Sequence, residues 1–188
     1  MGNQHSNKVI NDETFGEQGH FKVHIKLFEG MEREERIKLR EACQAWAAVW
    51  QTKEFRDWVL RFDFQDTNLT NQQIYDKLMG GVMGDVSIVD NQADIEIWVK
   101  HNNTGDVLNT TFVHDGTQWN GSPYLMTYSA AKLAGHLAHE YCRDLNFLHA
   151  NTSAERSVPF AVGKKTKRMA EAAAYAMAES TSARYFKD

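Results

Sequence analysis

The residues best suited to do chemistry together lie in a predicted helix at 130–145, where polar groups recur at helical spacing. At about 100° per residue, four of them share a stripe roughly 100° wide: His139, Arg143, His136 and Glu140. The opposite side of the helix is apolar: Leu133, Leu137, Tyr141 and Leu145. A solvated helix face more often carries Lys, Glu and Gln, so two imidazoles, a guanidinium and a carboxylate in one stripe indicate a functional face.

The string His-Glu-Tyr-Cys-Arg-Asp-Leu-Asn-Phe-Leu-His begins in this stripe and ends at His149. It resembles the extended zincin motif HExxHxxGxxH. In that motif two His four residues apart bind zinc, the Glu activates the metal-bound water, and a third His closes the site after a glycine turn. His139, Glu140 and His149 stand in the positions of the first ligand, the general base and the third ligand.

Two positions depart from the motif, with different consequences. Asn146 takes the place of the turn glycine, and Asn is the non-glycine residue best suited to a left-handed backbone, so we expect the turn to be kept. Arg143 takes the place of the second ligand. A guanidinium cannot be deprotonated and cannot bind a cation, so the geometry is predicted to survive while the zinc chemistry does not.

Two further segments are similar to small metzincin-like metallopeptidases encoded by phages and gut bacteria. The motif helix with its preceding Ala134-Gly135, the later string 157–163 (SVPFAVG) and the upstream string 69–79 (LTNQQIYDKLM) resemble that family in order, over roughly residues 20–163. The resemblance implies a zincin-like fold and a zinc peptidase ancestry. It also implies that Phe160 stands where the family carries Tyr, so any catalytic phenol is lost.

Several residues remain candidate metal ligands. His139 and His149 are candidate zinc ligands, and two protein ligands rarely hold zinc. His136, one turn earlier on the same face, is a candidate third ligand, and Cys142 would reach the site only by rotation. Glu140 is a candidate general base only if metal is bound. Otherwise we expect it to form a salt bridge with Arg143 or with the following helix. No cofactor is expected apart from zinc in a functional site.

The surrounding pattern predicts an α+β domain with a small mixed sheet and long helices near both ends. Residues 1–19 are polar and aperiodic and are predicted to be a tail, followed by one domain over 20–188. Alternating apolar residues predict strands at 21–27, 95–99 and 107–113. Helices are predicted at 31–52, where the apolar positions are Ile37, Cys43, Trp46, Ala47 and Trp50, and at 55–62, 71–79, 130–145 and 165–183. Thr70 and Gln73 have the spacing of a capping box.

Charge, hydropathy and cysteine content argue against several classes of protein. The net charge of −4 and the mixture of both signs argue against a dedicated nucleic-acid binder, and the basic run 164–168 is better explained as a solvated helix entry than as a phosphate site. No apolar run is long enough for a membrane span. The first twenty residues have no apolar h-region, so we expect no secretory signal and a cytoplasmic or virion location. The two cysteines suggest no disulfide scaffold.

The sequence therefore favours a metallopeptidase-like protein with a degenerate zinc site. We expect a non-catalytic role, either in binding or as a structural protein associated with a phage virion. The expected partners are proteins, including other virion subunits, with no nucleic acid or membrane partner. The alternative is an active zinc-dependent endopeptidase with an unusual ligand set.

Overall fold

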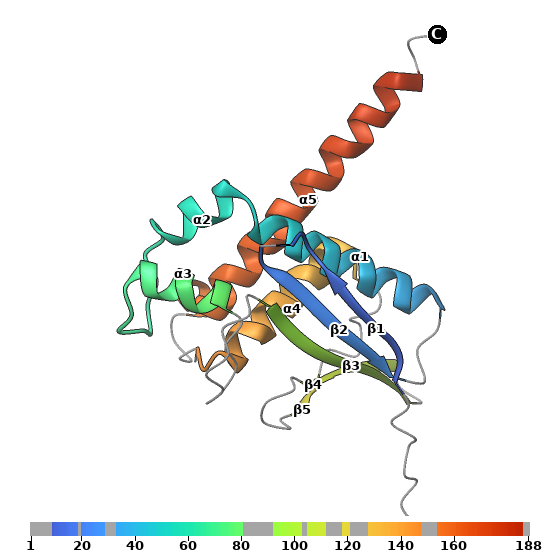
Figure 1. The fold of residues 1–188 in the computed structure, drawn as a ribbon, viewed down its shortest axis with the longest axis horizontal. Coiled ribbons are helices and arrows are strands. Elements are labelled where there is room, and N and C mark those ends of the chain that lie inside the picture. Colours follow the sequence, from blue (N-terminus) through green and yellow to red (C-terminus); the bar gives the residue numbers. More distant parts are fainter. Residues whose placement is uncertain are drawn as a thin grey trace, which may run out of the picture.

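The computed structural model describes residues 9–18, 20–28, 33–80, 92–102, 105–111, 118–120, 128–147 and 154–185. Helices and a β-sheet are both present, as the α+β prediction requires (Figure 1). The strands are β1 (Val9–Phe15), β2 (Lys22–Phe28), β3 (Gln92–Asn102), β4 (Gly105–Thr111) and β5 (Gln118–Asn120). The helices are α1 (Arg33–Trp50), α2 (Lys53–Val59), α3 (Asn71–Gly80), α4 (Ala130–Asp144) and α5 (Val158–Tyr185), with a short 3₁₀ turn at Ala154–Arg156.

The sheet is mixed and its strands lie in chain order, β1-β2-β3-β4-β5. Three neighbouring pairs are antiparallel, while β2 and β3 are parallel, with Ile25 opposite Ile95. Two parallel strands need a long crossover between them, and α1, α2 and α3 lie in that connection. The predicted strands at 21–27, 95–99 and 107–113 correspond to β2, β3 and β4.

The prediction of an aperiodic tail over residues 1–19 is wrong for part of that range, because Val9–Phe15 form β1 and pair antiparallel with β2. Strand pairing uses backbone groups, so this edge strand needs no regular alternation of apolar side chains. One side chain ties it to the helices: Glu13 accepts hydrogen bonds from the Arg40 guanidinium, whose Nε lies 2.8 Å from Oε2.

Helix α1 supplies much of the core, but one of the apolar residues predicted to face the core is exposed. Ile37 is 42% exposed, whereas Leu39 is fully buried. Nine residues separate Ile37 from the buried Trp46, which places the two side chains about 180° apart, while Leu39 lies within about 20° of Trp46. The other four predicted apolar positions of this helix are buried: Cys43, Trp46, Ala47 and Trp50.

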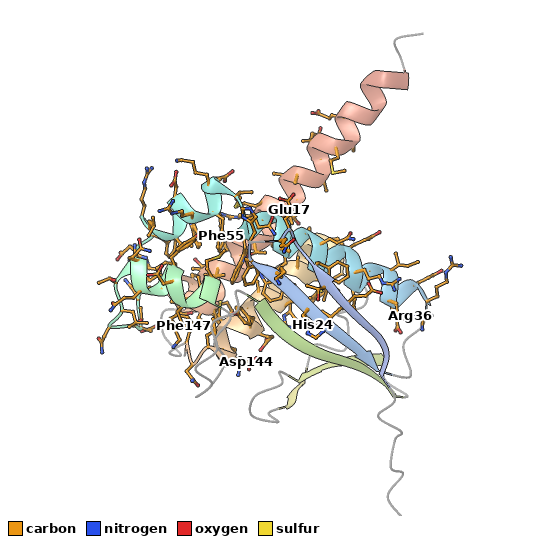
Figure 2. The ribbon with its side chains drawn as sticks, in the orientation of Figure 1. Glu17, His24, Arg36, Phe55, Asp144 and Phe147 are labelled. Atoms are coloured by element: carbon orange, nitrogen blue, oxygen red, sulfur yellow. The ribbon has the colours of Figure 1, made fainter. Side chains whose placement is uncertain are left out.

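Aromatic rings from several elements meet at the centre of the core. Phe55 of α2 is fully buried and stacks on Trp50 with 5.0 Å between ring centroids (Figure 2). Thr52 caps α2 by accepting a hydrogen bond from the Phe55 amide, so the helix begins two residues before its predicted start at 55. The predicted capping box before α3 is confirmed, since the Gln73 amide donates to Thr70 Oγ1 and the Thr70 amide donates to Gln73 Oε1.

Helix α5 begins at Val158, seven residues before the predicted start at 165. Pro159 and Gly163 are poor helix formers, but a proline in the first turn loses no helical hydrogen bond. The basic run 164–168 therefore lies inside the helix and not at its entry. The C-terminal part of α5 projects past α1 and α2 (Figure 1). Across the described residues, no helix combines the length and apolar composition that crossing a bilayer requires.

Candidate functional site

The motif helix is α4, and its two faces divide as the sequence predicted. Ser129 caps it by accepting a hydrogen bond from the Lys132 amide. The four predicted apolar positions are buried: Leu133, Leu137, Tyr141 and Leu145. On the polar side His136, His139 and Arg143 are half-buried. Glu140 is only 7% exposed, which is more buried than a stripe of solvated residues would be.

Glu140 forms the predicted salt bridge with Arg143. Arg143 Nη1 donates to Glu140 Oε2 at 3.0 Å. Burial raises the pKa of the Glu140 carboxyl, and the charge and hydrogen bond of Arg143 act against that rise. The guanidinium thus supplies a positive charge beside the carboxylate.

His136 lies near the other oxygen of the same carboxylate. Its Nε2 is 3.8 Å from Glu140 Oε1. Burial lowers the pKa of the His136 imidazole to about 4, with the charge of Arg143 contributing in the same direction. The imidazole is therefore neutral at physiological pH and has the protonation state of a metal ligand.

The geometry of the two described imidazoles does not fit a tetrahedral zinc ion. The His136 and His139 rings have centroids 6.5 Å apart and planes only 3° from parallel. A zinc-bound imidazole holds the ion in the plane of its ring, so two nearly parallel rings could share one ion only if their planes coincided. Among the described residues, no group of three His, Cys, Asp or Glu side chains is placed to hold a metal ion.

The remaining candidate ligands do not change this within the described chain. His149 falls in 148–153, outside the described residues, so its predicted return towards His139 stays a prediction. Cys142 is fully buried, and desolvation raises the pKa of its thiol well above the ordinary value. A thiol that resists deprotonation is a poor zinc ligand.

The turn after α4 has the left-handed residue that the motif requires. Asn146 has φ of 60°, as predicted from its glycine position. The Asn146 amide donates to the Arg143 carbonyl at 2.9 Å, and the Phe147 amide donates to the Cys142 carbonyl at 3.1 Å. These bonds close the last turn around a left-handed residue, so the helix ends where the zincin-like string predicts a change of direction.

Segment 157–163 is brought against the motif helix, as the start of α5. The ring of Phe160 meets that of His139 edge to face, with centroids 4.6 Å apart. A phenylalanine therefore occupies the aromatic position beside the candidate ligand, and it has no hydroxyl to offer.

A pair of glycines allows this close approach, a role that the sequence strings containing them did not reveal. A Cβ on Gly163 would lie 2.7 Å from the Gly135 carbonyl oxygen and 3.0 Å from His139 Cβ. A Cβ on Gly135 would lie 2.6 Å from the Gly163 carbonyl oxygen. The two helices therefore cross at positions where neither has a side chain. A glycine inside each of two helical patterns is the sequence feature that could have predicted this crossing.

The third string of the family resemblance, 69–79, also reaches α4. Tyr141 donates through its hydroxyl to the Leu78 carbonyl at 3.4 Å. Lys77 Nζ lies 5.0 Å from the centroid of the Phe147 ring, just after α4. The other two strings that carry the resemblance, 69–79 and 157–163, therefore both contact the motif helix.

The chain was compared with family models, curated proteins and solved structures. The chain matches no family model, no curated protein and no solved structure.

Proposed function

We propose that this chain is a zincin-like domain of the metzincin type whose site has exchanged zinc for an internal cation, and that it acts by binding without hydrolysis. The observation that carries the proposal is the Arg143 guanidinium, which takes the second-ligand position and hydrogen-bonds to Glu140 at 3.0 Å. The carboxylate that would activate a metal-bound water is instead engaged by a fixed positive charge.

Two further features support the zincin-like ancestry. Asn146 provides a left-handed turn at the motif's glycine position. Phe160 lies against His139, at the position where the resembling family has Tyr. A relict site would keep these backbone and packing features, because they also hold the fold together.

Zinc titration of three proteins tests this proposal: the parent, Arg143→His and Arg143→Met. We expect the parent to contain well under one zinc per chain. Arg143→His restores an imidazole at the motif spacing and should bind zinc about tenfold or more tightly, since even outer-shell partners of zinc ligands change affinity by that much. Arg143→Met removes the cation without adding a ligand and should gain little. Peptide hydrolysis by Arg143→His should stay weak, because Phe160 has no hydroxyl.

The alternative is an active zinc endopeptidase with an unusual ligand set, and the observation that favours it is His136, 3.8 Å from Glu140 and neutral. About one zinc per parent chain, lost in His139→Ala, together with chelator-sensitive hydrolysis of an unstructured peptide, would establish this alternative. Equal zinc affinity of all three proteins would contradict the view that Arg143 is what blocks the metal.

The family resemblance extends the proposal to a phage-encoded protein that acts through protein partners, including virion subunits. Mass spectrometry of purified particles of a phage that encodes this chain tests that part. We expect the chain among the particle proteins at a fixed copy ratio, and its absence from washed particles would contradict a virion role.

A further inference from the structure

The outer part of α5 exposes an uncharged helical surface. Every residue from Glu171 to Glu179 is exposed, and the seven between them are Ala, Tyr or Met. Tyr175 is 69% exposed and Met177 is 71% exposed. A helix surface in water usually carries charged residues on its exposed face, so two uncharged turns need an explanation.

One stripe of this helix has the spacing of a coiled-coil seam. Successive steps of four, three and four residues connect Arg168, Ala172, Tyr175 and Glu179. At about 100° per residue these four side chains fall within roughly 60° of one another. Their stripe continues the outward side of the inner part of α5, because Arg168 is exposed whereas Thr166, about 180° from Tyr175, is buried.

We propose that this seam, Arg168-Ala172-Tyr175-Glu179, is a self-association surface on which a second copy of the chain packs its own α5 antiparallel. The register that places Arg168 opposite Glu179 of the second copy also places Ala172 opposite Tyr175, because both pairs of numbers have the same sum. A two-fold axis then repeats each contact. Each tyrosine ring lies on a small residue, and each end of the seam is closed by an ion pair.

Charge complementarity indicates that the partner on this seam is a second copy of the chain and that the two helices run antiparallel. The seam is basic at one end and acidic at the other, so its complement is the same stripe reversed. A parallel pair would set Arg168 against Arg168 and Glu179 against Glu179. The contact is about 16 Å long at about 1.5 Å per residue, which is short for a stable interface, so the association should be weak and visible only at high concentration.

Sedimentation velocity of the full chain over a concentration series from micromolar to millimolar tests the proposal. We expect the parent's mass to rise from 21.5 kDa towards twice that value. Tyr175→Glu should remain monomeric throughout. Met177→Glu is the matched control and should associate like the parent, because it places the same charge about 160° away around the helix. The two positions are similarly exposed. A parent that stays monomeric overturns the proposal, as does equal behaviour of the two variants.

Charge reversal tests the antiparallel register. Arg168→Glu or Glu179→Arg alone should weaken association about tenfold, because each turns two symmetric ion pairs into repulsions. Both reversals in one chain should restore the parent's association. Single reversals that leave association unchanged would overturn the antiparallel arrangement, since a parallel pair exchanges one like-charge contact for another.

Discussion

The two faces of α4 are held in place by different forces. On the apolar face, Tyr141 is fully buried and its ring is 5.4 Å from that of Trp46, 5.9 Å from that of Trp50 and 6.2 Å from that of Phe21. On the polar face, Arg143 holds Glu140 at 3.0 Å and Phe160 packs its ring against His139. Close packing holds the apolar face, while an ion pair and one ring contact hold the polar face.

This difference predicts that substitutions on the apolar face cost more stability than substitutions on the polar face. Packing on the apolar face is sensitive to volume, because interiors are close-packed. On the polar face, the buried Glu140 carboxylate is paired with the partly exposed Arg143 guanidinium. The following predictions test the comparison, from the largest expected effect to the smallest.

Tyr141→Ala should lower the free energy of unfolding by about 3–5 kcal/mol, the range for removing a buried aromatic ring. The hydroxyl bond to the Leu78 carbonyl is lost as well. Urea unfolding followed by circular dichroism measures the change. Tyr175 is 69% exposed, so Tyr175→Ala is the matched control. This control should fall within about 0.5 kcal/mol of the parent. Similar losses in the two variants would contradict the assigned packing of α4.

His136→Phe should remove part of the acid sensitivity of the fold. The folded pKa of His136 is about 4, below its ordinary 6.5, so the unfolded chain binds the proton more tightly and stability falls as pH falls through this window. Protonation of His136 should lower the free energy of unfolding by on the order of 3 kcal/mol between about pH 7 and 4. Unfolding midpoints measured across that range should fall less steeply in the variant, and identical slopes would show that His136 is not buried in its neutral form.

Gly163→Ala should destabilise the chain by roughly 2 kcal/mol, the usual scale for forcing an extra methyl group into a packed contact, even though alanine favours a helix. The new methyl group would lie 2.7 Å from the Gly135 carbonyl oxygen, so α4 and α5 must separate. Thermal unfolding measures the loss. An increase in stability, as helix propensity alone predicts, would mean that the two helices do not cross at these glycines.

Arg143→Met should cost about 1 kcal/mol at neutral pH, because Arg143 is partly exposed and its ion pair is screened. Without the guanidinium, the pKa of the Glu140 carboxyl rises further, and a raised carboxyl pKa makes the folded chain bind the proton more tightly. The difference in free energy of unfolding between the parent and the variant should therefore become smaller as the pH is lowered towards 4.5, the ordinary pKa of a glutamate. A stability difference that stays constant from mildly alkaline to mildly acidic pH would contradict the pairing of Arg143 with Glu140.

Much of the fold was predictable because local signals agreed with the tertiary structure. Alternating apolar residues marked β2 and β3, and Ser129 and Asn146 lie at the two ends of α4. The signals failed where tertiary contacts override local preference. Val9–Phe15 became a strand through backbone pairing with β2, and Pro159 lies within the first turn of α5.

The sequence by itself determined which residues face one side of α4, since helical periodicity depends only on spacing. It also determined that Arg143 cannot be a metal ligand, because a guanidinium stays protonated. Only the tertiary structure decided that Glu140 is buried, that the His136 and His139 rings are parallel, and that Gly135 meets Gly163. Burial, ring orientation and helix crossing depend on neighbours distant in the chain, and no local pattern contains them.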